Sequence, residues 1–263
     1  MRARDFLTFV LMQVISKAKI KLFTSLHTKK YRYRHQMFLI EGKKLVQEAI
    51  ASGWKLESLV LREDITDWGE ENYEGDVLSW ADRDAFNQLS GHQQSEGIIG
   101  IVHFPSPDFC KQKEWTEIPQ ERGFVLDAIQ DPGNLGTIMR SLDWLNIRNI
   151  LLGPGCVDPL NLKSLRSSMG AVFRMNILPV GKLEDMPDEM KARLWLADME
   201  GPELGKANFK DDSLILIGNE ANGIGEELRK AVSHKVSIPR YGGGESLNAS
   251  IAASIIAWEM SKG

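Results

Sequence analysis

The chain is poor in cysteine, and it lacks the apolar runs and nucleotide-binding patterns that define several common classes. Cys110 and Cys156 are its two cysteines in 263 residues, so neither a disulfide framework nor a cysteine-based zinc site is expected. No apolar stretch is long enough to span a bilayer. The sequence has no Gly-x-Gly-x-x-Gly after a predicted strand and no P-loop. These absences favour a reduced, cytoplasmic protein without a membrane segment and weigh against Rossmann and P-loop enzymes.

Histidine is also scarce, and its placement does not indicate a metal site. The five histidines lie at positions 27, 35, 92, 103 and 234. Their spacing does not match that of the ligands in zinc sites. We therefore expect no metal ion and assign these side chains ordinary structural roles.

Charge is distributed unevenly along the chain, although the net charge is only −4. Residues 1–44 hold 11 Lys/Arg and 2 Asp/Glu, whereas the remainder holds 21 and 34. A localised basic segment of this kind is typical of a surface that binds a polyanion. A solvated basic helix without any partner would have the same composition, so charge alone leaves both interpretations open.

The length and the alternation of predicted elements indicate an α/β protein with two domains. Residues 1–104 are expected to form a small α/β domain, which begins with a helix that reaches about Tyr31. Its strands are predicted at 37–41, 56–62, 76–80 and 97–104. Residues 105–122 are charged, contain three prolines and show no periodicity, so they are expected to be a linker.

Residues 123–263 alternate apolar strands with helices, which predicts a parallel sheet covered on both faces. The strands are expected at 123–129, 148–153, 194–200, 213–219 and 234–239. The helices are expected at 134–146, 161–173, 184–192, 224–232 and 246–260. Ligands of such sheets bind beyond the carboxyl ends of the strands, so the loops at those ends are the candidate sites.

Three of these loops have unusual sequences. The first runs from Asp131 into a helix, with Asn134 as a predicted N-cap and Arg140 close enough to reach an anion at the helix start. The second, residues 218–225, is rich in glycine and contains Glu220. The third has three consecutive glycines at 242–244, followed by a helix of small residues. Each loop alone fits an ordinary turn as well as a binding site.

Together, the segments DPGNLGTIMR, LILIGNEANGIGEEL and SIPRYGGGESLNASIAASI resemble the three signature motifs of the SpoU/TrmH RNA 2′-O-ribose methyltransferases of the SPOUT superfamily. KYRYRHQMFLIEGKKLVQEAI is similar to the substrate-binding domain of that family, which resembles small α/β ribosomal RNA-binding proteins. The resemblance implies S-adenosylmethionine as cofactor, a ribose in structured RNA as substrate, a deep trefoil knot in the C-terminal domain, and a homodimer with active sites at its interface.

The resemblance also assigns the site, residue by residue. The positions that match the cofactor pocket are Met199, Gly218, Ile238 and Leu247. The positions that match the catalytic and structural polar set are Asn134, Arg140, Glu220, Ser246 and Asn248. Because a guanidinium keeps its proton at neutral pH, Arg140 is interpreted as an anchor for the RNA phosphate rather than as a base. Trp144 departs from the family pattern, in which small residues are usual, and is expected to alter local packing only.

Several alternatives remain at this point. Ribosomal RNA is favoured over transfer RNA by the extra N-terminal domain, but a transfer RNA methyltransferase stays possible. A non-catalytic RNA-binding or ribosome-assembly protein could keep the same fold. A knotted enzyme that methylates a base nitrogen is disfavoured by the spacing of Asn134, Gly136 and Arg140, which such relatives lack.

Overall fold

The computed structural model describes residues 13–65, 68, 78–91, 95–219 and 224–262. Contacts divide the chain into two compact units, which are described separately. The first comprises the chain up to Pro107 together with Leu160–Arg166, and the second comprises Asp108–Pro159 and the chain from Ser167 onward. No helix in the described residues is long and apolar enough to cross a membrane.

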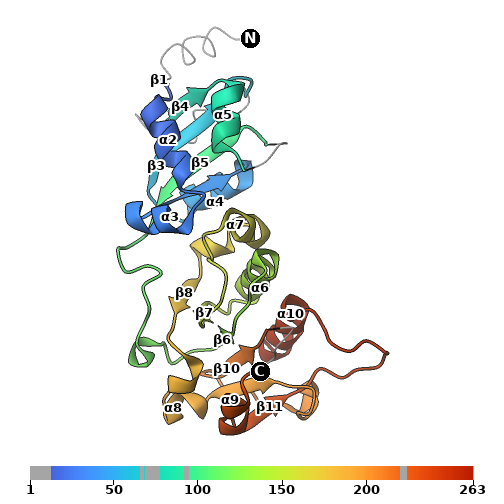
Figure 1. The fold of residues 1–263 in the computed structure, drawn as a ribbon. Coiled ribbons are helices and arrows are strands. Elements are labelled where there is room, and N and C mark those ends of the chain that lie inside the picture. The colour runs from blue at the N-terminus through green and yellow to red at the C-terminus, as the bar shows by residue number, and fades with distance from the viewer. Residues whose placement is uncertain (1–12, 66–67, 69–77, 92–94, 220–223, 263) are drawn as a thin grey trace. The chain divides into compact units, whose positions relative to one another are not determined.

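The first unit is built on a mixed five-stranded sheet with strand order β1-β4-β3-β5-β2. Strand β5 runs antiparallel to both β2 and β3, and the other pairs are parallel. Helices α2 and α5 pack together on one face (Figure 1). The strands are β1 (Gln13–Val14), β2 (Met37–Glu41), β3 (Leu56–Arg62), β4 (Leu78–Ala81) and β5 (Ile98–His103), and the helices are α2 (Lys17–Ser25), α3 (Lys29–His35), α4 (Lys43–Ala51) and α5 (Arg83–Leu89).

The single helix expected up to Tyr31 is wrong, because the chain forms two helices with a break between Leu26 and Thr28. The buried guanidinium of Arg32 donates to the carbonyls of Leu26 and His27, both at 2.9 Å. These bonds satisfy carbonyls that a continuous helix would have used internally. Arg32 is therefore a structural cation of the first unit, and the remaining basic residues of α2 and α3 make its charged surface.

The second unit is built on a parallel six-stranded sheet with strand order β11-β9-β10-β6-β7-β8. Its strands are β6 (Gly123–Leu126), β7 (Asn149–Leu152), β8 (Asn176–Pro179), β9 (Leu194–Ala197), β10 (Leu214–Ile217) and β11 (His234–Val236). Its helices are α6 (Pro132–Trp144), α8 (Asp188–Lys191), α9 (Glu226–Ala231) and α10 (Ala249–Met260), whereas most of α7 (Leu162–Ser168) belongs to the first unit. Short 3₁₀ turns occur at Trp115–Glu117, Ala171–Phe173, Leu183–Asp185 and Leu204–Lys206.

Side chains alternate between the two faces of this sheet, as the period of a strand requires. Leu194, Leu196, Leu214 and Leu216 join one core, to which α8 and α9 contribute Met190 and Leu228. Helices α6 and α10 pack against each other elsewhere in the unit. Both faces of the central strands are buried, which explains their near-continuous apolar sequences.

Three expectations for the second unit need correction. Asp131, not Asn134, caps α6, because its carboxylate accepts from the backbone N–H of Asn134 at 2.9 Å. Helix α10 begins at Ala249 rather than at position 246, with Asn248 as its N-cap. Strand β8 was not among the predicted strands; its four residues end in proline, which is usually found at the edge of a sheet. It occupies that edge position here.

Candidate active site

The second unit contains a cavity of about 780 Å³ at the carboxyl ends of three neighbouring strands. Strands β11, β9 and β10 lie side by side in parallel, so the segments that follow them meet at one edge of the sheet. Residues of the long loop between β11 and α10, drawn in Figure 1, also line the cavity. A volume of this size lies within the ~300–1,000 Å³ range typical of cofactor sites.

The four positions predicted to hold the cofactor all line this cavity. Met199 follows β9, Gly218 follows β10, Ile238 follows β11, and Leu247 lies just before α10. Ser246, from the predicted polar set, lines it too. The sheet order therefore brings together residues from three separate stretches of sequence.

The other predicted polar residues are placed differently. Asn134 and Asn248 are joined by a side-chain hydrogen bond of 3.0 Å, which connects the start of α6 to the start of α10. Arg140 lies on α6 with an exposed side chain and is not among the described residues that line the cavity. Glu220 lies outside the described residues. Trp144 is exposed at the end of α6, so it adds nothing to the core.

Sequence reasoning missed Asn219, which connects two of the strand ends. Its side-chain amide donates to the carbonyl of Ala128 at 2.8 Å, linking the segment after β10 to the segment after β6. Ala128 has a φ of 51°, a left-handed conformation that is unfavourable for an alanine. The bond from Asn219 holds this turn in place, just ahead of the helix that carries Asn134 and Arg140.

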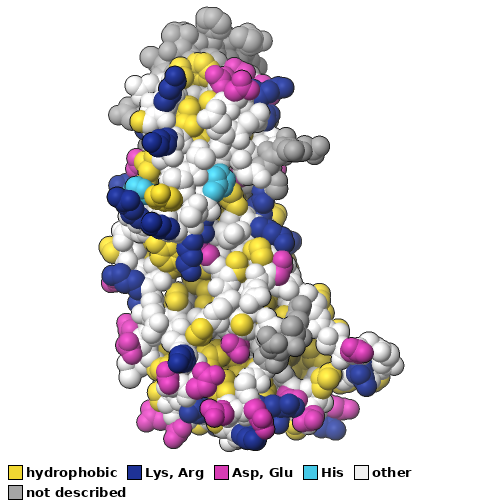
Figure 2. Space-filling model, in the orientation of Figure 1, with side chains coloured by type: hydrophobic (Ala, Val, Ile, Leu, Met, Phe, Trp, Pro, Cys, Tyr) yellow, Lys and Arg dark blue, Asp and Glu magenta, His cyan; other side chains and the backbone are white. Residues whose placement is uncertain are grey.

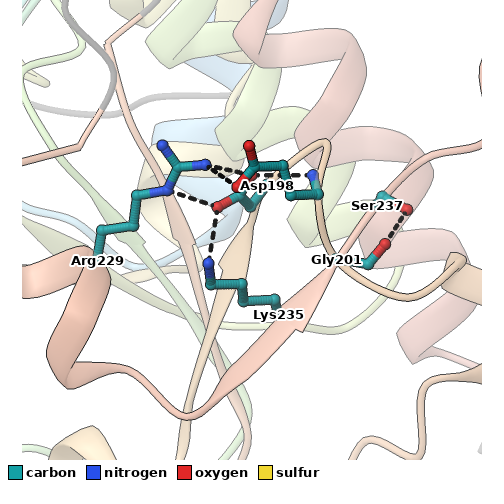
Figure 3. A network of polar contacts seen from close by, with 6 residues as sticks. Asp198, Gly201, Arg229, Lys235 and Ser237 are labelled. Carbon is teal, nitrogen blue, oxygen red and sulfur yellow. Dashed lines mark hydrogen bonds and ion pairs between the residues drawn. The ribbon is translucent and has the colours of Figure 1, made fainter. Parts of the chain in front are cut away.

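Sequence reasoning also missed an ion-pair network on the cavity wall (Figure 3). The guanidinium of Arg229 on α9 binds both carboxylate oxygens of Asp198, at 2.8 and 3.0 Å. It also donates to Glu200 at 2.8 Å. Lys235 on β11 lies 3.4 Å from the Asp198 carboxylate. Asp198, Glu200 and Arg229 all line the cavity.

The Asp198 carboxylate is kept ionised by these partners. Burial disfavours its charged form, since its side chain is only 8% exposed. The hydrogen bonds from the backbone N–H of Glu200 and from Arg229, with the positive charges of Arg229 and Lys235, outweigh burial and lower the pKa of Asp198. The same contacts raise the pKa of Arg229. The ion pair of Asp198 and Arg229 therefore stays charged at neutral pH.

Comparison with known sequences identifies the family. A profile described as the SpoU rRNA Methylase family matches residues 122–258, which is more than half of the chain. The chain belongs to the SpoU rRNA methylase family. A second profile, described as an MRM3-like substrate binding domain, matches residues 17–100. The SpoU match covers the cavity and every predicted site residue, and the second match covers the basic helices α2 and α3.

Relatives of this SpoU protein match over nearly its full length. It is 29% identical to the 23S rRNA (guanosine(2553)-2′-O)-methyltransferase RlmP of Bacillus subtilis, over 92% of this chain and 95% of the relative. A protein of the TrmH family from Porphyromonas gingivalis has a similar structure, with a TM-score of 0.80, 28% identity, and coverage of 94% and 98%. The AdoMet-bound rRNA methyltransferase from Sinorhizobium meliloti gives a TM-score of 0.80 at 25% identity, with coverage of 95% and 97%.

The cavity of this SpoU protein fits S-adenosylmethionine in size and chemistry. Its wall is apolar where Ile217, Ile238 and Leu247 meet, which suits the flat adenine ring. The ends of β9, β10 and β11 place main-chain groups around the same space, where they can bind the polar edge of a nucleoside. Among the described residues, no cluster of three His, Cys, Asp or Glu side chains could hold a metal ion.

Proposed function

We propose that this protein transfers the methyl group of S-adenosylmethionine to the 2′-oxygen of a ribose in ribosomal RNA. The observation that carries the proposal is the meeting of Met199, Gly218, Ile238, Leu247 and Ser246 around one cavity in a chain of the SpoU family. The relative from Bacillus subtilis, named as a 23S rRNA 2′-O-methyltransferase, supports ribosomal RNA as the substrate. Because ribosomal RNA is the proposed substrate, we propose that the protein acts in the cytoplasm.

The cofactor side of the site is formed by the strand ends. Residues after β9, β10 and β11 would hold the adenosine, with the apolar side chains of Ile238 and Leu247 covering its ring and excluding water. When bound, S-adenosylmethionine supplies an activated methyl group on a sulfonium. Ser246 lies on the wall of the same cavity, where its hydroxyl can orient the polar groups of cofactor or ribose. Fixing the reactants in line can supply several kcal/mol of the barrier reduction.

The RNA side of the site is assigned to α6. Arg140 is exposed, so its guanidinium is available to a phosphate of the substrate RNA and can stabilise charge that develops on the attacking oxygen. Asn134 and Asn248 fix the relative position of α6 and α10 through their shared hydrogen bond. We propose the same kind of structural role for Glu220.

We also propose that the protein is a homodimer, because α10 presents apolar side chains on more than its buried face. Ile251, Ile255 and Trp258 of α10 are exposed at helical spacing, as is Leu247 just before the helix, and Trp258 is 57% exposed. A helix that is apolar all round is normally covered on all sides. Since Leu247 also lines the cavity, a second copy on this face would lie next to the active site. The family resemblance further supports a trefoil knot in the C-terminal backbone.

The first unit is proposed to bind the RNA, as residues 1–104 were predicted to do, with 105–122 as the linker and 123–263 as the catalytic domain. Exposed basic side chains cover α2 and α3, and Figure 2 shows them in dark blue near α3. They are Lys17, Lys21, Lys29, Lys30 and Arg34. Tyr33 packs edge-on against Phe104 under Lys29, so Tyr31, stacked with His35, is the better candidate to contact a base.

Methylation of purified RNA tests this proposal directly. Ribosomal RNA and transfer RNA from a strain without this gene would be incubated separately with the protein and S-adenosylmethionine labelled on the methyl group. The RNA would then be digested to nucleosides, and we expect the label on a 2′-O-methyl nucleoside. Label on a base, label only on transfer RNA, or no transfer at all would contradict the proposal.

A further inference from the structure

We propose that Arg229 is a positioning residue for the cofactor, which acts by fixing Met199 on the wall of the cavity. This inference rests on the proposed function. It concerns residues 198–201, which we call the Met199 turn. Met199 is 73% exposed and lines the cavity, so nothing in its own side-chain packing determines where it lies.

Arg229 binds the residues on both sides of Met199. Its guanidinium makes a two-pronged contact with Asp198 at 2.8 and 3.0 Å and a further bond to Glu200 at 2.8 Å. Such a fork fixes orientation as well as distance, because the guanidinium is planar and its donors have set directions. The backbone of Met199 is thus held at both ends by one side chain from α9.

The end of β11 and the residue after it hold the other side of the Met199 turn. The hydroxyl of Ser237 donates to the carbonyl of Gly201 at 2.7 Å (Figure 3). Any Cβ at Gly201 would lie 2.7 Å from the backbone nitrogen of Val236, closer than real Cβ atoms approach. Glycine is therefore required there, and the turn lies tightly between α9 and β11.

The charges of the network indicate positioning rather than attraction of the cofactor. Asp198 and Glu200 are balanced by Arg229 and Lys235, so the cluster has no net charge with which to draw in a sulfonium. The network instead holds the backbone of the Met199 turn rigid, so that the exposed side chain of Met199 has a fixed starting point. A thioether side chain makes favourable contacts with aromatic rings, and adenine is the ring available in the cofactor. Ordering this contact in advance reduces the entropy lost on binding.

Binding of S-adenosylhomocysteine by the full-length protein, measured by calorimetry, tests the inference. The variants are Met199→Ala, Arg229→Gln, and the two combined. Each single variant is expected to weaken binding about tenfold, which corresponds to ~1.4 kcal/mol. Because Arg229 acts through Met199, the affinity of the double variant for S-adenosylhomocysteine should be no lower than that of the single variant with the lower affinity. The turnover number at saturating S-adenosylmethionine should stay unchanged in Arg229→Gln, while its KM for the cofactor rises.

The chain provides a matched control in the pair of Arg174 and Asp143. This pair is also two-pronged, with contacts of 2.7 to 3.1 Å and similar exposure, but it does not line the cavity. Arg174→Gln should lower the melting temperature about as much as Arg229→Gln and leave the affinity for S-adenosylhomocysteine within twofold of the wild type.

Three results would overturn the inference. Arg229→Gln could lower the melting temperature yet bind as tightly as the wild type, which would make the ion pair purely structural. The losses of affinity in the two single variants could add fully, which would mean that Arg229 does not act through Met199. Wild-type protein that binds no S-adenosylhomocysteine would overturn the proposed function itself, and that outcome is distinct from the first two.

Discussion

The side-chain amide of Asn248 donates a hydrogen bond of 3.0 Å to the side-chain oxygen of Asn134, 114 positions earlier in the chain. The oxygen of the same Asn248 side chain accepts from the backbone N–H of Ser250 at 2.9 Å and from its hydroxyl at 2.6 Å. Further along, the hydroxyl of Ser254 donates to that of Ser141 at 2.7 Å. Asn248 therefore caps α10 and bonds it to α6, and the pair of Ser254 and Ser141 forms a second contact between the same two helices.

Replacing Asn248 should separate these two roles. Asn248→Ala removes both the N-cap and the bond to Asn134, and we expect it to lower the free energy of unfolding by about 2 kcal/mol. Asn248→Ser keeps a capping oxygen but is too short to reach Asn134, so its expected cost is about 1 kcal/mol. Urea denaturation measures both values. A serine variant as stable as the wild type would show that the bond to Asn134 contributes nothing, and equal stability of the two variants would show the same of the N-cap.

Arg140 should be needed for methyl transfer and not for cofactor binding. It is exposed on α6 and does not line the cavity, so Arg140→Ala should abolish transfer while S-adenosylhomocysteine binds with unchanged affinity. Calorimetry and a transfer assay provide the two readouts. Arg140→Lys keeps the positive charge without the planar fork and should retain only a small part of the activity. Loss of cofactor affinity in Arg140→Ala would contradict its assignment as an anchor for RNA phosphate.

The exposed apolar face of α10 should hold the proposed dimer together. Ile251→Glu puts a charge in the middle of this face, so the variant should elute as a monomer when its mass is measured by light scattering. Thr116→Glu, an equal change of charge at an exposed position outside α10, serves as the control and should remain a dimer. A monomeric wild-type protein would refute the proposed dimer.

Basic residues of α3 should set the salt dependence of RNA affinity. Lys29 and Lys30 are exposed, so reversing both charges should weaken binding and flatten the plot of log affinity against log salt concentration. The slope should fall by about 0.7 to 0.9 for each phosphate that the variant no longer binds. Lys206→Glu, at an exposed site in the second unit, should change the slope less. An unaltered slope in the Lys29 and Lys30 variant would place the RNA elsewhere.

Asp127 should reduce stability at neutral pH. It follows β6, where burial and then the negative charge of Glu184 raise its pKa. A carboxyl group whose pKa is raised by folding binds its proton more tightly in the folded protein. The resulting stability is complete below the pKa of the unfolded state, about 3.9, and is lost as the pH rises through the pKa of the folded state. Asp127→Asn should therefore raise the melting temperature at pH 7, with a gain that disappears on acidification. Glu184→Gln should reduce the gain, and a destabilised Asp127→Asn at pH 7 would contradict this account.

Most of the sheet of the second unit was predictable because β6, β7, β9 and β10 are short, almost wholly apolar and separated by helices, a pattern typical of a covered parallel sheet. The cavity followed from that sheet, since the carboxyl ends of neighbouring parallel strands share an edge. Residues such as Gly218 and Ile238 were expected there because the motifs that contain them follow strands. Their meeting in one cavity depends on a strand order that sequence periodicity does not encode.

Interactions between distant side chains were not predictable. Arg229 lies in a charged helix where nothing distinguishes it from its neighbour Lys230, and only the fold brings it to Asp198. The break after Leu26 depends in the same way on the buried guanidinium of Arg32. Asp131 could have been recognised as the cap of α6, because it precedes Pro132, which is favoured in the first turn of a helix.

The bond from Asn219 to Ala128 spans 91 positions of the chain. It joins the ends of β10 and β6, which lie next to each other at the centre of the six-stranded sheet. During translation, β6 therefore leaves the ribosome before β10 has been synthesised, and the two strands can pair only after that delay. At ~5–20 residues per second, synthesis of the intervening chain takes between about 5 and 20 seconds. For that time one side of an apolar strand lacks its neighbour in the sheet, and an unpaired strand edge of this kind favours aggregation.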